Sequence, residues 1–269
     1  MKRPISLCVV NYNGERYLDV TLRAAYEHPV FEEILVIDNE STDAGLQLVR
    51  EKFPATRVLE MGDNRGPGAA RNAGFHAATQ DLILFVDNDV SVAPDCAELL
   101  RRGLEEHPRA FVAAPRVLYA ARPDIVQYEG ANCHFMGHMT LRNANRPAAD
   151  CLTDVAEMNS VVTASFMVDR RRWQDGELFD ESFIFNYEDH DFGTRTRVLG
   201  HEILAVPDAR VFHGEGTEGL SFRTGGQYSK RRVYYLIRNR WQIILKNYSL
   251  RSLLLFSPCL ALYELFQLA

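Results

Sequence analysis

The sequence predicts an α/β protein whose mainly parallel central sheet is covered by helices on both faces. Two observations lead to this prediction. Short apolar runs, as in buried strands, alternate with segments whose apolar residues recur at helical spacing, and polar turn residues separate the two kinds of segment. Such a β–α–β alternation is typical of parallel sheets, and its crossover connections are expected to be right-handed.

The elements of the first half follow from these patterns in order. Residues 5–10 form an apolar strand that ends at the turn of residues 11–14, and residues 16–27 have helical spacing. After a strand at residues 33–37, Ser41, Thr42 and Asp43 are expected to cap a helix that extends to Phe53. The remaining expected strands are residues 56–61, 81–86 and 110–114, and the remaining expected helices are residues 66–77 and 94–106.

The alternation stops in the second half of the chain. Residues 119–157 are rich in Ala, Arg, Asn and Pro and are interpreted as a long insertion, which is often functional when it lies beside a site. Order is expected to return over residues 160–168. A helix at residues 188–199, a strand at residues 202–206 and a helix at residues 228–246 follow.

Composition limits the class of protein. The chain has 269 residues, of which 46% are hydrophobic and 25% charged, as in ordinary globular proteins. A formal net charge of −6 argues against a general nucleic-acid binder, which carries a basic face. The five cysteines form no close pair, so we expect neither a disulfide framework nor structural zinc, and a reducing compartment fits. The N-terminus shows no signal-peptide pattern.

Polar side chains follow several of the expected strands. Asn11 and Asn13 follow the first strand, Asp38 follows the second, and residues 87–89 follow the fourth. Because parallel strands end at the same edge of a sheet, these residues are expected to converge there. A single Asp after a strand is ordinarily a turn or a helix cap, but several together favour a binding site.

The sequence Asp87-Asn88-Asp89 is the strongest of these signals. Two carboxylates separated by one residue at a strand end suit a hard divalent cation that also binds a diphosphate. The alternative is an Asx-type turn that closes the strand.

The segment of residues 64–74 precedes the fourth strand. Its small residues let the backbone approach a ligand, and the helix start within it favours anions, so Asn64, Gly66 and Arg71 are candidate contacts to a nucleotide or its phosphates. The dinucleotide fingerprint is incomplete because its third glycine is missing, so a nicotinamide site is excluded. Tight packing of the alanines of this helix against the sheet is an alternative that is compatible with binding.

An acidic segment follows alternating aromatic residues at 183–187. Glu188 and Asp189 begin a helix, where the helix dipole favours acids, and this alone accounts for one carboxylate. Three acids around His190, namely Glu188, Asp189 and Asp191, favour a general base in this segment. His213 ends a short apolar strand, and it is interpreted either as structural or as a ligand that completes a cation site at Asp89.

The C-terminal region contains a stretch with basic and aromatic residues, followed by an apolar stretch. Residues 253–263 are strongly apolar but too short for a membrane span, so a helix on a membrane surface, a helix on a partner and a helix that closes the core all remain open. Basic and aromatic residues alternate over residues 231–246, which suits contact with an anionic lipid surface and equally suits a solvated helix face.

In order and context, these motifs resemble one known family. The chain is similar over residues 5–247 to family 2 of the inverting nucleotide-sugar glycosyltransferases, which have the GT-A fold, and within it to bacterial rhamnosyltransferase-like enzymes of surface polysaccharide synthesis. The resemblance rests on the motifs at residues 9–13, 36–43, 64–74, 85–89, 179–191 and 211–213.

The resemblance implies a role for each candidate residue. Asp38 would contact the nucleobase and Asp87 the ribose or the nucleotide. Asp89 with His213 would bind Mg2+ or Mn2+, and Asp189 would be the catalytic base. Donor binding would also involve Asn11, Asn13, Asn64, Gly66, Arg71, Asn88 and Glu188. Glu40 and His190 stand where the family often has glycine and a small apolar residue, which leaves the donor sugar open.

The function so implied is inverting transfer of a sugar from a UDP- or dTDP-sugar to a hydroxyl of a saccharide or lipid-linked acceptor. The alternative is a catalytically silent nucleotide-sugar-binding or scaffold domain on the same fold. The GT-A domain would cover residues 1–225, with a nucleotide-binding half at 1–118 and an acceptor-binding half at 119–225, and C-terminal helices would occupy 226–269. A cytoplasmic location is expected, with peripheral contact to the inner face of the cell membrane.

Overall fold

The computed structural model describes residues 2–214 and 230–268, and its centre is an 11-stranded sheet with a separate two-stranded sheet beside it. The first half contains β1 (Ile5–Asn11), α1 (Glu15–Tyr26), β2 (Phe31–Asp38), α2 (Gly45–Lys52), β3 (Arg57–Glu60), α3 (Pro67–Ala77), β4 (Leu82–Asp87), β5 (Val90–Val92), α4 (Cys96–Glu106) and β6 (Ala110–Tyr119). The second half contains β7 (Arg122–Tyr128), β8 (Ala131–His134), β9 (His138–Leu141), β10 (Arg146–Pro147), β11 (Ala156–Met158), β12 (Ser165–Asp169), α5 (Glu188–Val198), β13 (Glu202–His213), α6 (Lys230–Asn247) and α7 (Leu250–Leu268).

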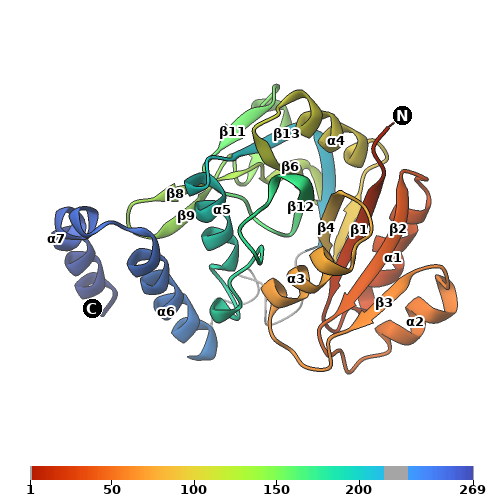
Figure 1. Cartoon of the computed structure of the whole chain (residues 1–269), viewed down its shortest axis with the longest axis horizontal. Coiled ribbons are helices and arrows are strands. Elements are labelled where there is room, and N and C mark those ends of the chain that lie inside the picture. Colours follow the sequence, from red (N-terminus) through yellow and green to blue (C-terminus); the bar gives the residue numbers. More distant parts are fainter. Residues whose placement is uncertain (1, 215–229, 269) are drawn as a thin grey trace.

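The first half forms the predicted parallel sheet. β3, β2, β1 and β4 lie side by side in this order and all three pairings are parallel, so their carboxyl ends share one edge (Figure 1). Every residue of β1 is buried, which explains its continuous apolar sequence: a strand covered by helices on both faces has no solvated side. The predicted sheet and helices of this half are confirmed to within a few residues.

Antiparallel strands extend the sheet on the other side of β4. β12 runs antiparallel between β4 and β6, while β13 pairs with β6 in parallel over a long stretch. The strands predicted at residues 110–114 and 202–206 are therefore too short. Pro115 and Pro207 interrupt the apolar runs in the sequence, yet β6 continues through Pro115, and β13 accommodates Pro207 at an irregularity of its register.

Helices cover both faces of the sheet. α1, α2 and α4 pack on one face, where Leu22, Val49 and Leu104 join the core with β1. α3 and α5 pack on the other face, where Phe75 and Phe192 are buried. The two apolar cores hold the strand ends in place, and the polar groups at those ends are left to form a site.

The interpretation of residues 119–157 as an irregular insertion is wrong. The structure places β7 to β11 there: β7 pairs with β6 and β10, β8 pairs with β9, and β11 pairs with β13. The strand signal is weak in the sequence because these strands are short and half exposed, so they lack continuous apolar runs.

The predicted cap of the second helix is confirmed in part. α2 begins at Gly45, whose N–H bonds to the side chain of Asp43, while the residue directly before the helix, Ala44, has no capping side chain. Asp43 accepts a hydrogen bond from Gly45 N and another from Glu15 N, and Ser41 bonds to Asp38. These polar residues thus tie together the turns at the strand ends. The short strand β5 was not predicted, since three residues are too few for a periodic pattern.

α6 and α7 project from the body of the molecule next to α5 (Figure 1). One side of α7 packs onto α6 in a small core with Met136, Ile244 and Leu260. Residues 228–229 of the predicted helix lie outside the described residues, as do residues 226–227 of the predicted C-terminal region, and the domain limit at 225 stays a prediction. In the described part of the chain, no helix has the length and hydrophobicity needed to cross a membrane.

Candidate active site

A hydrogen-bonded network joins the ends of β1, β2 and β4. Asn11 donates through Nδ2 to Asp38 Oδ1 at 2.7 Å, and its Oδ1 accepts from Asn88 Nδ2 at 2.9 Å. All three side chains are buried. The predicted convergence of these residues is confirmed by their contacts. The carboxylate of Asp38 also accepts from Ser41, so in this structure it organises the edge, and its contact with a nucleobase stays a prediction.

Two further predicted residues support the same edge. The backbone N–H of Asn13 donates to Ser41 Oγ at 2.8 Å, and its side-chain oxygen accepts from Thr42 N at 2.8 Å. The side-chain oxygen of Asn64 accepts from Asn39 Nδ2 and from Gly66 N, which fixes the approach to α3. In the structure both asparagines shape turns.

Arg71 connects the two halves of the site. From the buried first turns of α3 it donates to Asp87 Oδ1 at 2.7 Å and to the carbonyl of Thr163 at 2.9 Å, and its Nη1 lies 3.9 Å from Glu188 Oε1. Its guanidinium also stands over the ring of Phe179, 5.6 Å from the centroid. Residues from β4, α3 and the start of α5 are thus brought together.

Some polar atoms of this cluster lack a hydrogen-bond partner. Nε and Nη1 of Arg71 and Oε2 of Glu188 are buried and make no hydrogen bond within the described residues. Buried polar groups in native proteins are nearly always satisfied by protein, water or ligand. The unsatisfied polar atoms of Arg71 and Glu188 therefore mark this buried cluster as a candidate for a functional site.

The acidic pair at the start of α5 is electrostatically unusual. Burial raises the pKa of Glu188 to about 8 and that of Asp189 to about 6, and for Glu188 the neighbouring charge of Asp189 adds to the effect. Asp189 also accepts a hydrogen bond from His190 N at 2.8 Å, which favours its ionised form. Burial thus disfavours the charged form of both acids, and the two carboxyl groups titrate as a pair.

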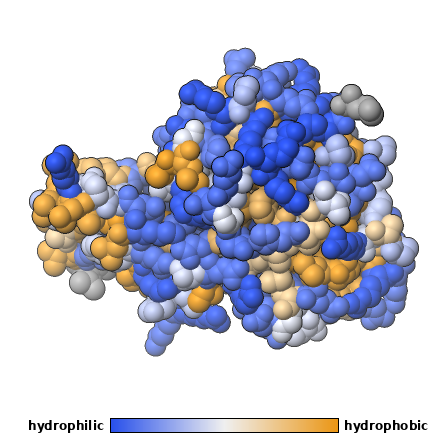
Figure 2. All heavy atoms as spheres, viewed as in Figure 1, coloured by the Kyte–Doolittle hydropathy of each residue, from blue (hydrophilic) through white to orange (hydrophobic). Residues whose placement is uncertain are grey.

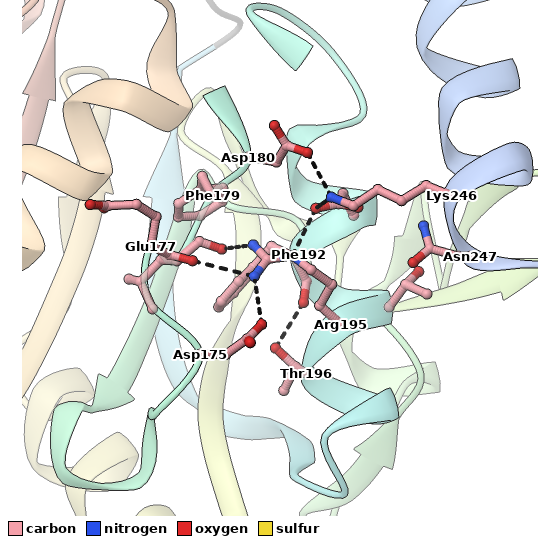
Figure 3. Close-up of polar contacts among 12 residues, drawn as sticks. Asp175, Glu177, Phe179, Asp180, Phe192, Arg195, Thr196, Lys246 and Asn247 are labelled. Carbon is pink, nitrogen blue, oxygen red and sulfur yellow. Dashed lines mark hydrogen bonds and ion pairs between the residues drawn. The ribbon is translucent and has the colours of Figure 1, made fainter. Parts of the chain in front are cut away.

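The third acid of this segment, Asp191, has a structural role. Asp191 is fully buried and forms ion pairs with Arg195 at 2.9 Å and with Lys246 at 3.0 Å. Lys246 also binds Asp180, and Arg195 reaches Asp175, so the network links α6 to α5 and to the preceding loop (Figure 3). Of the three predicted acids, Glu188 and Asp189 remain available for chemistry.

His190 is buried behind this pair. Its Nδ1 lies 3.6 Å from Cys133 Sγ, and burial lowers the pKa of its imidazole to about 4. A neutral, enclosed imidazole does not compete with Asp189 as a base on an acceptor.

Asp89 and His213 face one another beyond Asp87. His213 Nε2 lies 3.2 Å from Asp89 Oδ1, and its Nδ1 lies 2.5 Å from Oε1 of the buried Gln127. With Nδ1–H donating to Gln127, a neutral imidazole turns the lone pair of Nε2 toward a carboxylate oxygen. Two acceptors at this distance need a proton or a cation between them, so the pair fits a divalent ion.

In the part of the chain that the structure describes, few side chains at this position could serve as metal ligands. In residues 2–214 and 230–268 no group of three or more His, Cys, Asp and Glu side chains is arranged to hold a metal. Mg2+ and Mn2+ need few protein ligands when a diphosphate and water supply the rest. The predicted ligands Asp89 and His213 are therefore adjacent and chemically suitable.

Gly66 brings α3 against the loop before α5. Its φ is 89°, and a Cβ atom here would stand 1.8 Å from the carbonyl oxygen of Ile184. The site thus requires glycine at this position for its backbone conformation and for space.

Several residues that shape the site were not predicted. Gln127 lies in β7, within the region interpreted as irregular, and Thr163 contributes only a backbone carbonyl. Neither has a recognisable sequence signal. Asn239 in α6 contacts the loop before α5 and was missed because it stands far away in the sequence.

Solved structures show the fold. Over 90% of this chain and 47% of the other, the model superimposes on the crystal structure of GalNAc-T7 with UDP, GalNAc and Mn2+, with a TM-score of 0.70 and 17% identity. Over 91% of this chain and 67% of the other, it superimposes on S. aureus TarS 1-349 in complex with UDP-GlcNAc, with a TM-score of 0.62 and 20% identity. The fold is that of GT-A glycosyltransferases, as predicted.

The chain belongs to glycosyl transferase family 2, whose family model matches residues 6–153. It is 31% identical over 106 residues to the putative glycosyltransferase EpsH of Bacillus subtilis (strain 168), and 32% identical over 139 residues to the succinoglycan biosynthesis protein ExoO of Rhizobium meliloti (strain 1021). These matches cover 38% and 51% of this chain, and 31% and 38% of the relatives' length.

Another relative matches over a longer stretch but with a lower sequence identity. The N-acetylglucosaminyl-diphospho-decaprenol L-rhamnosyltransferase of Mycobacterium tuberculosis (strain CDC 1551 / Oshkosh) is 27% identical over 221 residues, which cover 74% of this chain and 71% of that protein. The family model confirms the predicted family, and this match agrees with the predicted resemblance to rhamnosyltransferases.

Proposed function

We propose that this chain transfers a sugar from a UDP- or dTDP-sugar to a hydroxyl group of a saccharide or lipid-linked acceptor, with inversion, in cell-surface polysaccharide synthesis. The observation that supports this most directly is the position of Arg71. It contacts Asp87 at the strand edge and approaches Glu188 beside Asp189, so the candidate donor residues and the candidate base belong to one polar cluster.

The donor would lie along the strand edge. Asp38, Asn11, Asn13 and Asn64 would hold the nucleoside, and the N-terminus of α3 with its unsatisfied Arg71 donors would face the phosphates.

Asp89 and His213 would hold Mg2+ or Mn2+. When bound, this ion would neutralise negative charge that develops on the departing diphosphate. Gln127 fixes the ring of His213 so that Nε2 faces Asp89, as partners behind metal ligands commonly do.

Asp189 would accept the proton of the acceptor hydroxyl. Its pKa of about 6 leaves it ionised at neutral pH while keeping it more basic than an ordinary Asp. The oxygen so activated would attack the anomeric carbon on the face opposite the diphosphate, which inverts the configuration. The raised pKa of Glu188 favours its protonated form, in which it would donate a hydrogen bond to donor or acceptor.

The relatives support the donor class. The TarS structure contains UDP-GlcNAc, and the GalNAc-T7 structure contains UDP and Mn2+. The rhamnosyltransferase relative is named for a diphospho-decaprenol acceptor, which supports a lipid-linked acceptor for this chain. The matches to EpsH and ExoO cover only 31% and 38% of the length of those relatives, so the acceptor of this chain rests on this proposal alone.

The test measures release of the nucleoside diphosphate, UDP or dTDP, from several UDP- and dTDP-sugars with Mn2+, for the parent chain and for Asp89→Ala and Asp189→Asn. Loss of the Asp89 carboxylate should abolish metal-dependent turnover, and Asp189→Asn should retain UDP binding while losing about 100-fold or more in rate. A parent chain that binds UDP-sugar without turning it over would instead be the silent binding domain.

Peripheral membrane contact through α6 and α7 is part of the proposal. Residues 230–268 hold seven Lys and Arg against one Glu, in a chain whose formal net charge is −6. Apolar side chains on α7 are largely exposed, and Figure 2 shows hydrophobic residues gathered on this projection. The exposed ones are Leu250, Leu254, Leu255, Leu262, Leu265 and Phe266. Cationic and apolar side chains together suit the surface of an anionic bilayer on the cytoplasmic side.

A further inference from the structure

The loop that leads into the acidic pair has an unusual backbone. Ile184, Asn186 and Tyr187 have φ values of 59°, 62° and 69°. Residues with side chains rarely adopt this left-handed region, and β-branched residues such as Ile184 are the least suited to it. A conformation of this kind persists only where surrounding contacts hold it, and such segments concentrate at functional sites.

Asn239 supplies these contacts from α6. It is fully buried, and its Nδ2 donates to the backbone carbonyls of Phe183 at 2.8 Å, Phe185 at 2.9 Å and Asn186 at 2.7 Å. Nη1 of Arg238 donates to Asn239 Oδ1 at 2.8 Å, which turns the two amide hydrogens toward the loop. The two hydrogens of Nδ2 are thus shared among three carbonyl oxygens, of which that of Phe183 also accepts from Phe185 N at 2.6 Å.

α3 holds the same loop from the opposite side. The carbonyl of Ile184 lies so close to Gly66 that no side chain fits there. Tyr187, the last residue of the loop, is the N-cap of α5 and has left-handed backbone angles. The backbone of residues 183–187 therefore decides where α5 begins, and with it the position of Asp189.

We propose that Asn239 is a positioning residue: by holding residues 183–187 it places the Asp189 carboxylate for proton transfer. The inference rests on the proposed function, since Asp189 is the base there, and it adds a residue of α6 to the machinery of that site. Catalytic groups that shift by about 1 Å lose on the order of 100-fold in rate, so a side chain that acts only on the backbone can matter this much.

Two substitutions test the proposal. Asn239→Ala removes the donor, and Asn239→Asp keeps the shape but puts carboxylate oxygens against three carbonyl oxygens. Gln242→Ala is the matched control, because Gln242 lies on the same helix and binds the side chain of Ser182 without touching the loop carbonyls. We expect kcat to fall about 100-fold in both Asn239 variants with donor affinity nearly unchanged, and the control to match the parent.

The pH profile separates positioning from general damage. If Asp189 leaves its partly buried position, its pKa falls toward the ordinary value, and the acidic limb of the kcat profile moves to lower pH. If a substitution only lowers the fraction of folded protein, the dependence of kcat on pH should keep the shape that it has in the parent. An unshifted profile with a loss of kcat that follows the folded fraction would overturn the proposal.

Hydrogen exchange tests the same point without activity. In both Asn239 variants the amides of residues 183–189 should exchange faster than in the parent, while those of β1 and β4 stay protected. Unchanged exchange in this loop would refute the role of Asn239 directly. If the parent transfers no sugar, the proposed function fails, and the exchange data still decide whether Asn239 holds the loop.

Discussion

At the scale of single residues, Arg71 shows how burial and charge build the site. A buried guanidinium needs counter-charges, and Asp87 and Glu188 stand close to it. Arg71 donates to Asp87 at 2.7 Å and lies 3.9 Å from Glu188, whose neutral form is favoured by burial.

The pH dependence of transfer should report Asp189. This group must be ionised to accept a proton, and its pKa is raised to about 6, so kcat should fall as the pH drops through about 6. If the pKa of Asp189 were that of an ordinary Asp, kcat would stay unchanged down to about pH 4. The measurement is kcat at saturating donor and metal from pH 4.5 to 8, and a flat profile over this range would contradict the assignment.

A second prediction at this scale concerns Gly66. Gly66→Ala combines an unfavourable backbone conformation with a clash against Ile184, so it should lower the free energy of unfolding by about 2–4 kcal/mol and reduce transfer. Gly62→Ala is the control: Gly62 also has a positive φ, of 78°, but nothing lies within 4 Å of the added Cβ. Urea denaturation of both variants measures the difference, and equal losses would show that the clash with Ile184 is unimportant.

At the scale of elements, α6 and α5 are joined by ion pairs through Lys246 (Figure 3). Asp191 is fully buried between Lys246 and Arg195, which makes it costly to leave with only one partner. The network explains why an acid next to the candidate base takes no part in the chemistry.

Lys246→Met should therefore destabilise the protein by about 1–3 kcal/mol, since Asp191 loses a charge partner while Arg195 remains. Arg102→Met serves as the control, because the Arg102–Glu106 pair is exposed on both sides and such pairs contribute about 0–1 kcal/mol. Thermal and urea unfolding give the comparison. Similar small effects for both variants would mean that the ion pairs of Lys246 contribute no more than a surface pair.

At the scale of the whole molecule, charge and hydrophobicity are unevenly distributed. The strand-edge site lies in the body, whereas the projection of α6 and α7 exposes apolar side chains (Figures 1 and 2). Among the cations of the projection, Lys230, Arg231 and Arg251 are exposed, while Arg232 and Arg240 are buried. This arrangement would let the projection contact a lipid surface while the site faces an acceptor attached to it.

Vesicle sedimentation tests this contact. The parent should bind vesicles that contain phosphatidylglycerol more tightly than pure phosphatidylcholine, and 0.5 M salt should weaken the binding. Leu254→Glu with Leu262→Glu should reduce binding by roughly tenfold or more, because two largely exposed apolar side chains become charged. Val198→Glu, which changes an exposed apolar residue on α5, should have no effect. Equal binding by all three proteins would rule out the projection as the contact surface.

Local patterns were sufficient for much of this protein. The apolar runs and helical spacing of the first half located the parallel strands and their helices, and the placement of polar residues after strands located the edge formed by Asn11, Asp38 and Asn88. These inferences succeed because a buried parallel strand needs a continuous apolar run, and because parallel strands share one carboxyl edge.

Only the tertiary structure decided which polar residues act together. It assigned Asp191 to an ion-pair network that does not include Glu188 and Asp189. It also placed paired strands in residues 119–157 and brought Asn239 against a loop more than fifty residues earlier. Burial and long-range contacts determine these outcomes. Burial and long-range contacts cannot be read from local sequence patterns, since a short polar strand or a lone asparagine has no periodic pattern of its own.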